Sequence, residues 1–199
     1  MKVRILHLIA IAMSVMLLAL GGCGDTSGVS VSANIVPTYD GVNTSDVDAV
    51  QDMCPSGSLE YFADHSATAT FSAYILNPAI TPSVTVYIDG YTINYASSAD
   101  SPNAPPIQTY AASETLSFTV AGSSTAQMSG TVEFVDLIRK IQYIEDLSSS
   151  SYQSSANYLN NYVATYTFEG HTDGGSHFTF SASAPFEIGD FDNCQLPTN

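Results

Sequence analysis

Alternation of apolar and polar residues runs along most of this chain, and it limits the fold to one built from strands. Apolar side chains fall at every second position over residues 29–35, and the same pattern recurs over 67–75, 116–120 and 128–134. Successive side chains of a strand point to opposite faces, so a period of two is typical of strands that bury one face. Gly, Pro and Ser residues separate these segments, which favours an antiparallel, turn-rich fold.

The segment 84–95 changes parity once, at Asp89-Gly90. An extra residue keeps the same face inward when it forms a bulge, and Gly is a usual bulge residue. We therefore predict one strand with a bulge at this point. Pro37 is expected to end the first strand and to begin an irregular stretch over 37–60. Residues 97–106 are expected to be loop or edge, because their prolines cannot pair in a central ladder.

The period becomes helical between Asp136 and Leu147, which predicts a short helix with Asp136 as its N-cap. Two further alternating segments, 162–169 and 178–188, flank Asp173-Gly174-Gly175. Such residues supply the positive φ angles of a tight hairpin turn. This hairpin would place His171 and His177 opposite each other.

About seven alternating strands with one short helix predict an all-β fold of two antiparallel sheets packed face to face. Over roughly residues 60–192 the pattern resembles an immunoglobulin-like or fibronectin-type β-sandwich. The resemblance implies a tyrosine corner, for which Tyr162 is the candidate. The chain departs from antibody-type domains because it has no Trp and no cysteine pair at the usual inter-sheet positions. Only the broad sandwich class is therefore expected.

The N-terminus carries a second pattern. Lys2 and Arg4 precede an apolar run over residues 5–20, which ends in Leu20-Gly21-Gly22-Cys23. This layout is typical of a secretory signal, and its last four residues resemble a bacterial lipobox. The resemblance implies that residues 1–22 are a helical signal peptide, and that Cys23 is lipidated and anchors the protein to a membrane. An uncleaved helical anchor and cleavage without a lipid are the alternatives.

These patterns divide the chain into a signal peptide over 1–22, a lipidated N-terminus with the first strand and an irregular tether over 23–59, and a β-sandwich over 60–199. The lipoproteins that it resembles reside in the bacterial cell envelope. In those lipoproteins, Asp directly after the lipidated cysteine often retains the protein at the inner membrane. Gly24 stands at that place here, so the resemblance implies the outer membrane rather than the inner one. Losing Lys2 and Arg4 with the signal takes the net charge from −15 to −17. So acidic a chain is a poor partner for nucleic acid.

Cys54 and Cys194 are the other two cysteines. A lone pair in an oxidising compartment is expected to form a disulfide. Four nearby carboxylates are weak candidates for a shared calcium site that the disulfide would draw together: Asp46, Asp48, Asp190 and Asp192. The sequence has no EF-hand run, and a solvated acidic edge is the simpler interpretation. We therefore expect no metal and no cofactor.

The chain has no nucleophile elbow, phosphate-binding loop, dinucleotide fingerprint or zinc-protease motif. No catalytic residue can be assigned, and we expect a non-enzymatic binding or structural accessory module of the envelope. Its partners would be the membrane, through the lipid, and an unknown envelope protein or surface ligand, with Tyr152 and Tyr158 as candidates for an exposed recognition surface. The alternatives are a calcium-binding module and a secreted hydrolase with an unrecognised site.

Overall fold

The computed structural model describes residues 28–149, 151–152 and 159–194. The expected signal peptide and the lipidation site Cys23 therefore lie outside the described residues. The described part is mostly β-structure with one short helix, α2 (Leu137–Ser148). Within it, no helix is long and apolar enough to cross a bilayer.

The strands form two sheets. The first sheet has the order β2 (Val42–Asn43), β1 (Val29–Tyr39), β4 (His65–Ile75) and β7 (Ala126–Val135). The second has the order β3 (Asp46–Asp48), β9 (His177–Gly189), β8 (Asn160–Thr172), β5 (Ser83–Ser97) and β6 (Tyr110–Ala121). All neighbouring strands are antiparallel except β3 and β9, which are parallel.

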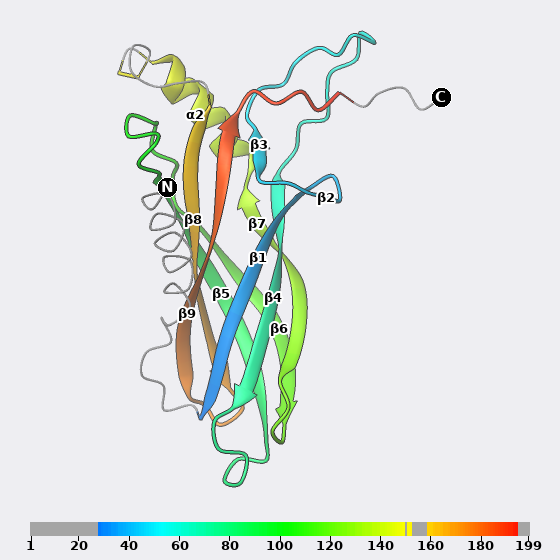
Figure 1. Ribbon diagram of the computed structural model, residues 1–199, viewed down its shortest axis with the longest axis vertical. Coiled ribbons are helices and arrows are strands. Elements are labelled where there is room, and N and C mark those ends of the chain that lie inside the picture. Colours follow the sequence, from blue (N-terminus) through cyan, green and yellow to red (C-terminus); the bar gives the residue numbers. More distant parts are fainter. Residues whose placement is uncertain (1–27, 150, 153–158, 195–199) are drawn as a thin grey trace, which may run out of the picture.

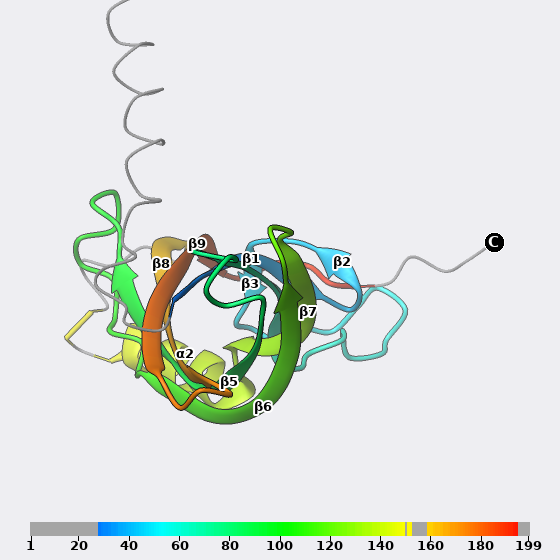
Figure 2. The same cartoon turned by 90° about the horizontal axis from the view of Figure 1, so that it is seen from below.

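The long strands run along the longest axis of the molecule (Figure 1), and one sheet curls into a half-barrel (Figure 2). The molecule therefore has two ends, which we call the turn end and the helix end. The turn end holds Gly28 and the connections 76–82, 122–125 and 173–176. The helix end holds α2, the long connection 49–64 and residues 190–194 (Figure 1).

Each local feature with a strong turn or cap signal forms as the sequence predicts. The register of β5 against β6 and β8 shifts between Ile88 and Gly90, which is the predicted bulge. The Asp136 side chain accepts a hydrogen bond from the Arg139 amide and caps α2. β8 and β9 form the predicted hairpin, in which His171 lies opposite His177.

The expectation that Pro37 ends the first strand is wrong. β1 continues to Tyr39, and Pro37 lies opposite Ala67 in β4. The Pro37 carbonyl accepts a hydrogen bond from the Thr44 amide on the other side of the strand. The missing N–H therefore faces the sheet edge, where no ladder bond to β4 is lost. Two short strands, β2 and β3, also lie within the stretch that we expected to be irregular.

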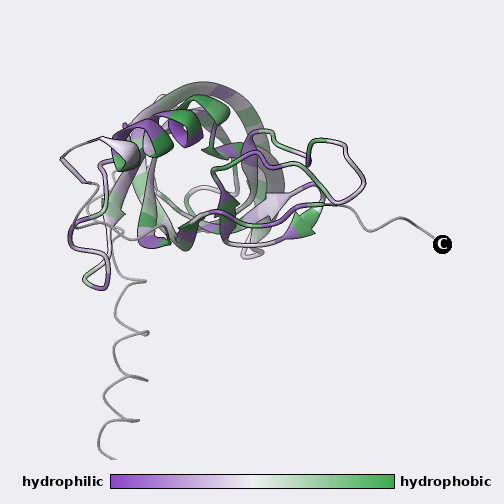
Figure 3. Ribbon diagram, turned by 90° about the horizontal axis from the view of Figure 1, so that it is seen from above, coloured by the Kyte–Doolittle hydropathy of each residue, from purple (hydrophilic) through white to green (hydrophobic). Residues whose placement is uncertain are grey.

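The first strand, expected in the 23–59 tether segment, is a full member of the first sheet because β1 pairs with β4 along its length. Aromatic rings fill the space between the sheets. Phe71 of the first sheet meets Phe168 and Phe180 of the second edge-on. Figure 3, the view onto the helix end, shows α2 lying across that end of the sheets. Tyr143 and Leu147 of α2 are buried there.

Tyr162 does not form the tyrosine corner implied by the resemblance. Its hydroxyl donates to the Pro105 carbonyl at 2.5 Å, a residue 57 positions earlier in the chain. A tyrosine corner bonds to backbone only a few residues upstream. Tyr162 instead holds the proline-containing loop between β5 and β6 against the start of β8.

Candidate functional site

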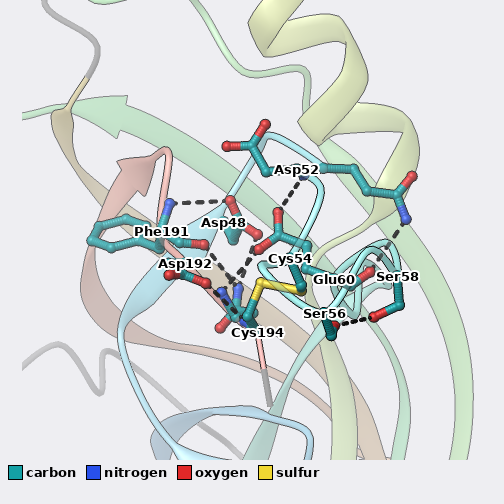
Figure 4. The surroundings of a disulfide bond; sticks show 11 residues. Asp48, Asp52, Cys54, Ser56, Ser58, Glu60, Phe191, Asp192 and Cys194 are labelled. Atoms are coloured by element: carbon teal, nitrogen blue, oxygen red, sulfur yellow. Dashed lines mark hydrogen bonds between the residues drawn. A yellow bond between two sulfur atoms is a disulfide. The ribbon is translucent and has the colours of Figure 1, made fainter. Parts of the chain in front are cut away.

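Cys54 and Cys194 form a disulfide with Cα atoms 5.5 Å apart, as the sequence predicts. The bond joins the long connection 49–64 to the segment that follows β9, and polar side chains surround it (Figure 4). Asp48 and Glu60 are both buried beside it. Of the four carboxylates that the sequence suggested for this region, Asp192 lies beside the disulfide together with Glu60, and Asp48 binds the C-terminal segment.

Asp48 binds the C-terminal segment through both carboxylate oxygens. Oδ1 accepts from the amides of Val50 and Phe191, and Oδ2 accepts from the Asn193 side-chain amide at 2.9 Å. Burial raises the pKa of Asp48, although these hydrogen bonds oppose the change. The β3–β9 pairing places Asp48 opposite Gly189, which brings the carboxylate within reach of these donors.

Glu60 also binds the C-terminal segment, and it was not among the residues that the sequence pointed to. Its Oε1 accepts from the Asp52 amide at 2.7 Å, and its Oε2 accepts from the Asn193 amide at 2.9 Å. Sequence patterning gave no signal for it, because Glu60 lies in an irregular connection and its partner Asn193 is 133 residues away.

These hydrogen bonds give the cluster a structural role rather than that of a cation site. We call Asp48, Glu60 and Asn193, where both carboxylates accept hydrogen bonds from Asn193, the clasp. Ligand atoms of Glu60, Asp192 and Cys194 lie within 4.8 Å of one another, but the Cys194 sulfur is committed to the disulfide. Both Glu60 oxygens already accept N–H bonds, which a cation would have to displace. Asp46 and Asp190, two of the sequence candidates, are exposed and lie outside that group. Calcium needs six to eight oxygen ligands, more than this group offers.

A buried lysine lies next to the clasp, in the face of α2 that packs on the sheets. The fully buried Lys140 Nζ donates to the Ala63 carbonyl at 2.7 Å and lies 4.7 Å from the centre of the Tyr39 ring. Burial lowers its pKa to about 8. The spacing of Lys140, Tyr143 and Leu147 puts them on one helical face, and that spacing was the available sequence signal for burial.

His65 is also buried there and is held neutral. Its ring stacks on Tyr39 with centroids 5.1 Å apart, and its Nε2 lies 3.1 Å from the Thr44 carbonyl oxygen. Burial lowers its pKa to about 4. The hydrogen bond of His65 runs to Thr44 and that of His171 to Asp89, so neither of these bonds connects a histidine to a serine hydroxyl.

On the outer face of the second sheet, His171 and His177 face each other across the hairpin with ring centroids 5.9 Å apart. The Nδ1 atom of His171 lies 2.8 Å from Asp89 Oδ2, and its ring stacks on Tyr87. A carboxylate that orients a histidine is common around metal sites, but zinc needs three or four protein ligands. Two imidazoles on a solvated face do not meet that requirement.

A hollow in the described part of the chain opens at the helix end, with a volume of about 630 Å³. Tyrosine, proline and small polar residues line it: Tyr95, Ala96, Ser97, Pro102, Asn103, Ala104, Pro105, Pro106, Ser151, Tyr152 and Tyr162. It thus contains Tyr152, one of the two tyrosines predicted to form a recognition surface. The other, Tyr158, lies outside the described residues.

The hollow is rigid on one side and uncharged throughout its described lining. The Tyr95 hydroxyl donates to the Phe134 carbonyl and the Tyr162 hydroxyl to the Pro105 carbonyl, so both rings are fixed by the fold. Apart from tyrosine, the lining residues carry no ionisable side chain. Such a surface can stack on and hydrogen-bond to a neutral ligand, and it offers no acid, base or nucleophile with a perturbed pKa near neutrality.

No known protein-family model matches the sequence, and a search of curated proteins found no match. The solved structure of Northeast Structural Genomics Consortium target SoR45 is similar, with 12% identity and a TM-score of 0.33 over 89% of this chain and 97% of that chain. Spo0M, a sporulation control protein from Bacillus subtilis, is similar with 11% identity and a TM-score of 0.34 over 85% of this chain and 51% of that chain. The chain therefore spans about half the length of Spo0M. The described part of this chain is β-rich and matches both structures only distantly.

Proposed function

We propose that this protein is an envelope-anchored lipoprotein that acts as a non-enzymatic binding or structural accessory module. Cys23 would carry the lipid, and the β-domain would be an immunoglobulin-like sandwich. The N-terminal layout of a basic start, an apolar run and Leu20-Gly21-Gly22-Cys23 supports the anchor.

The strand order supports the immunoglobulin-like assignment. Seven strands of the described residues are long, and the first, second and fifth of them (β1, β4 and β7) form one sheet. The third, fourth, sixth and seventh form the other, in the order β9-β8-β5-β6. A constant-type immunoglobulin domain differs in one respect, because its fourth strand joins the first sheet.

A binding role rests on the hollow that contains Tyr152. Tyrosine gives a large contact area at low cost in conformational entropy, and prolines hold the opposing loop stiff. The ligand would be uncharged where it enters the hollow, such as an aromatic or proline-containing segment of an envelope protein. Nucleic acid is a poor candidate, because Lys140 is buried and Arg139 is bonded to Asp136, Gln108 and Thr109.

Affinity capture from intact envelopes tests both parts of this proposal. The wild-type chain, Tyr152→Ala and Tyr74→Ala would be compared, since Tyr74 is an exposed tyrosine far from the hollow. We expect a partner that Tyr152→Ala loses and Tyr74→Ala keeps. Equal capture by all three proteins would remove the hollow as the binding site. Mass analysis of the N-terminus in the same samples should give a chain that begins at lipidated Cys23, and an unmodified N-terminus would refute the anchor.

A further inference from the structure

The connection between β4 and β5 exposes large apolar side chains at the turn end of the molecule. Ile80 is 78% exposed, the highest value among the large apolar side chains of the described residues, and Leu76 is 56% exposed. Exposed side chains of this kind are typical of a surface that contacts a protein or a membrane. The connection 49–64 at the helix end also exposes Met53, Leu59 and Tyr61, so the choice between the two ends depends on where the chain enters the domain and on charge.

This connection is ordered, so the apolar residues are held outward by the fold. The amides of Ile80 and Thr81 both donate to the Asn77 carbonyl, which closes a tight turn. The Gly122 amide donates to the Pro82 carbonyl and joins the connection to the next turn. The loop therefore presents Ile80 on a fixed support.

The chain enters the domain beside these residues. The Leu76 amide donates to the Gly28 carbonyl at 2.9 Å, so the first described residue lies next to the apolar loop. Residues 24–27 separate Gly28 from Cys23, and this stretch spans at most about 17 Å when extended. A lipid on Cys23 would therefore hold the turn end, rather than the helix end, against the bilayer.

Charge favours the same orientation. The three connections at the turn end, 76–82, 122–125 and 173–176, carry a single ionisable side chain, Asp173, whose carboxylate accepts from the Thr85 amide. The helix end also carries Arg139, which is paired with Asp136, and the buried Lys140. Its other carboxylates outside the buried Asp48 and Glu60 far outnumber these cations: Asp40, Asp46, Asp52, Asp64, Asp100, Glu145, Asp146, Asp190 and Asp192. Anionic headgroups repel that end and leave the turn end as the face that can approach lipid.

We propose that the turn end is a membrane-contacting surface, in which Leu76 and Ile80 insert into the interfacial region of the bilayer that carries the Cys23 anchor. This inference rests on the proposed lipid anchor. The short tether and the apolar loop then act together, because the lipid confines the loop near the surface and the loop fixes the orientation of the domain. The hollow at the opposite end would consequently face away from the membrane, toward a partner.

The chain contains no tryptophan, so a single introduced tryptophan reports on its own position. The lipidated Ile80→Trp protein would be reconstituted in vesicles of phosphatidylethanolamine and phosphatidylglycerol that contain brominated phosphatidylcholine. We expect bromine quenching and a blue shift of its emission. Ile138→Trp is the matched control, because Ile138 is 74% exposed but lies in α2 at the helix end, and its emission should not change. Leu76→Trp provides the same readout if Ile80→Trp does not fold.

Flotation of the same vesicles separates failure of this inference from failure of the anchor. Protein that floats without quenching at position 80 keeps the anchor and overturns the membrane-contacting surface. If Cys23 proves unlipidated, a chain that begins at Cys23 can be coupled to a maleimide lipid through the Cys23 thiol. The coupling is specific because Cys54 and Cys194 are disulfide-bonded. The quenching comparison then tests the loop alone. A blue shift that grows with protein concentration in the absence of vesicles would instead assign the surface to a second copy and overturn the proposal.

Discussion

The backbone amide of Glu133 in β7 donates a hydrogen bond to the Tyr91 hydroxyl oxygen in β5 at 2.8 Å, which ties the first sheet to the second. Two more tyrosines of the second sheet reach the same strand. Tyr166 donates to the Glu133 carbonyl at 2.6 Å, and Tyr95 donates to the Phe134 carbonyl at 2.5 Å. Each ring packs in the core while its hydroxyl satisfies a backbone group of the opposite sheet.

Replacing Tyr166 by Phe should destabilise the fold although it removes a single oxygen atom. The Glu133 carbonyl would lose this partner in a half-buried position, which costs about 1–2 kcal/mol of unfolding free energy. Urea denaturation followed by circular dichroism measures the change. Tyr74→Phe is the control, because Tyr74 is exposed on the outer face of the first sheet, and it should unfold as the wild type does.

Glu133 should make stability depend on pH near neutrality. Burial, reinforced by the negative charges of Asp64 and Asp136, raises its pKa from 4.5 to about 7, and its buried Oε1 has no hydrogen-bond partner. Between these pH values the folded state binds more protons than the unfolded state, so the free energy of unfolding falls as pH rises. Glu133→Gln should therefore be more stable than the wild type at pH 8, by about 1 kcal/mol after solvent screening, and similar to it at pH 4.5.

Denaturation curves of both proteins at several pH values measure this difference. His65 contributes a slope of the opposite sign in an overlapping range, because burial lowers its folded pKa from 6.5 to about 4. The stability that neutral His65 contributes is lost as pH falls through that range. This contribution is the same in the wild type and in Glu133→Gln, so it cancels in the difference between their free energies of unfolding. A difference between the two proteins that stays constant from pH 4.5 to 8 would contradict the prediction.

Removing the disulfide should cost more than any of the single hydrogen bonds. It joins residues 140 positions apart. A cross-link over so long a loop lowers the conformational entropy of the unfolded chain and so stabilises the folded state by roughly 4–5 kcal/mol. The Cys54→Ser, Cys194→Ser double variant should show this loss in urea denaturation. The clasp around it should weaken as well, seen as faster amide exchange at Asp52 and Asn193, whose N–H groups bind Glu60. An unchanged free energy of unfolding would show that the hydrogen bonds of the clasp hold this end together without the disulfide.

Gly170 in β8 should not tolerate even a methyl group. A Cβ there would lie 2.3 Å from the Tyr87 carbonyl oxygen and 2.7 Å from the Phe178 ring. Backbone cannot move aside cheaply, so Gly170→Ala should cost about 1–3 kcal/mol of unfolding free energy. Gly174→Ala is the matched control in the turn of the same hairpin, since its nearest neighbour is the Thr172 hydroxyl at 3.6 Å. Equal stability of the two variants would mean that the sheet adjusts freely at Gly170.

The predicted elements form where the signal is local. Alternation places the long strands, Asp136 begins the helix, and Asp173-Gly174-Gly175 turns the last hairpin. The bulge before Gly90 follows from the parity change in one segment. Pro37 failed as a strand end because its effect depends on which side of the strand has a partner, and that is a property of the sheet.

The candidate site was only partly visible in the sequence. Pairing of Cys54 with Cys194 follows from their number. The recognition role of Tyr152, suggested by its setting among polar residues, stays a prediction, although Tyr152 does line a hollow. The hollow around Tyr152 needs the loop between β5 and β6, which Tyr162 holds through Pro105. A contact between residues 57 positions apart leaves no periodic trace in a sequence.

By itself, then, the sequence determined the long strands, the helix and the last hairpin turn, because a strand's faces, a cap and a tight turn depend on neighbours a few residues apart. It did not determine where β1 ends, nor the short strands β2 and β3. Tertiary structure alone decided that Glu60 and Asp48 bind the segment after β9, that Lys140 is buried, and that burial near Asp64 and Asp136 raises the pKa of Glu133. Burial and the supply of hydrogen-bond donors are set by segments that meet only when the two sheets pack, and those meetings fix the chemistry of each polar group.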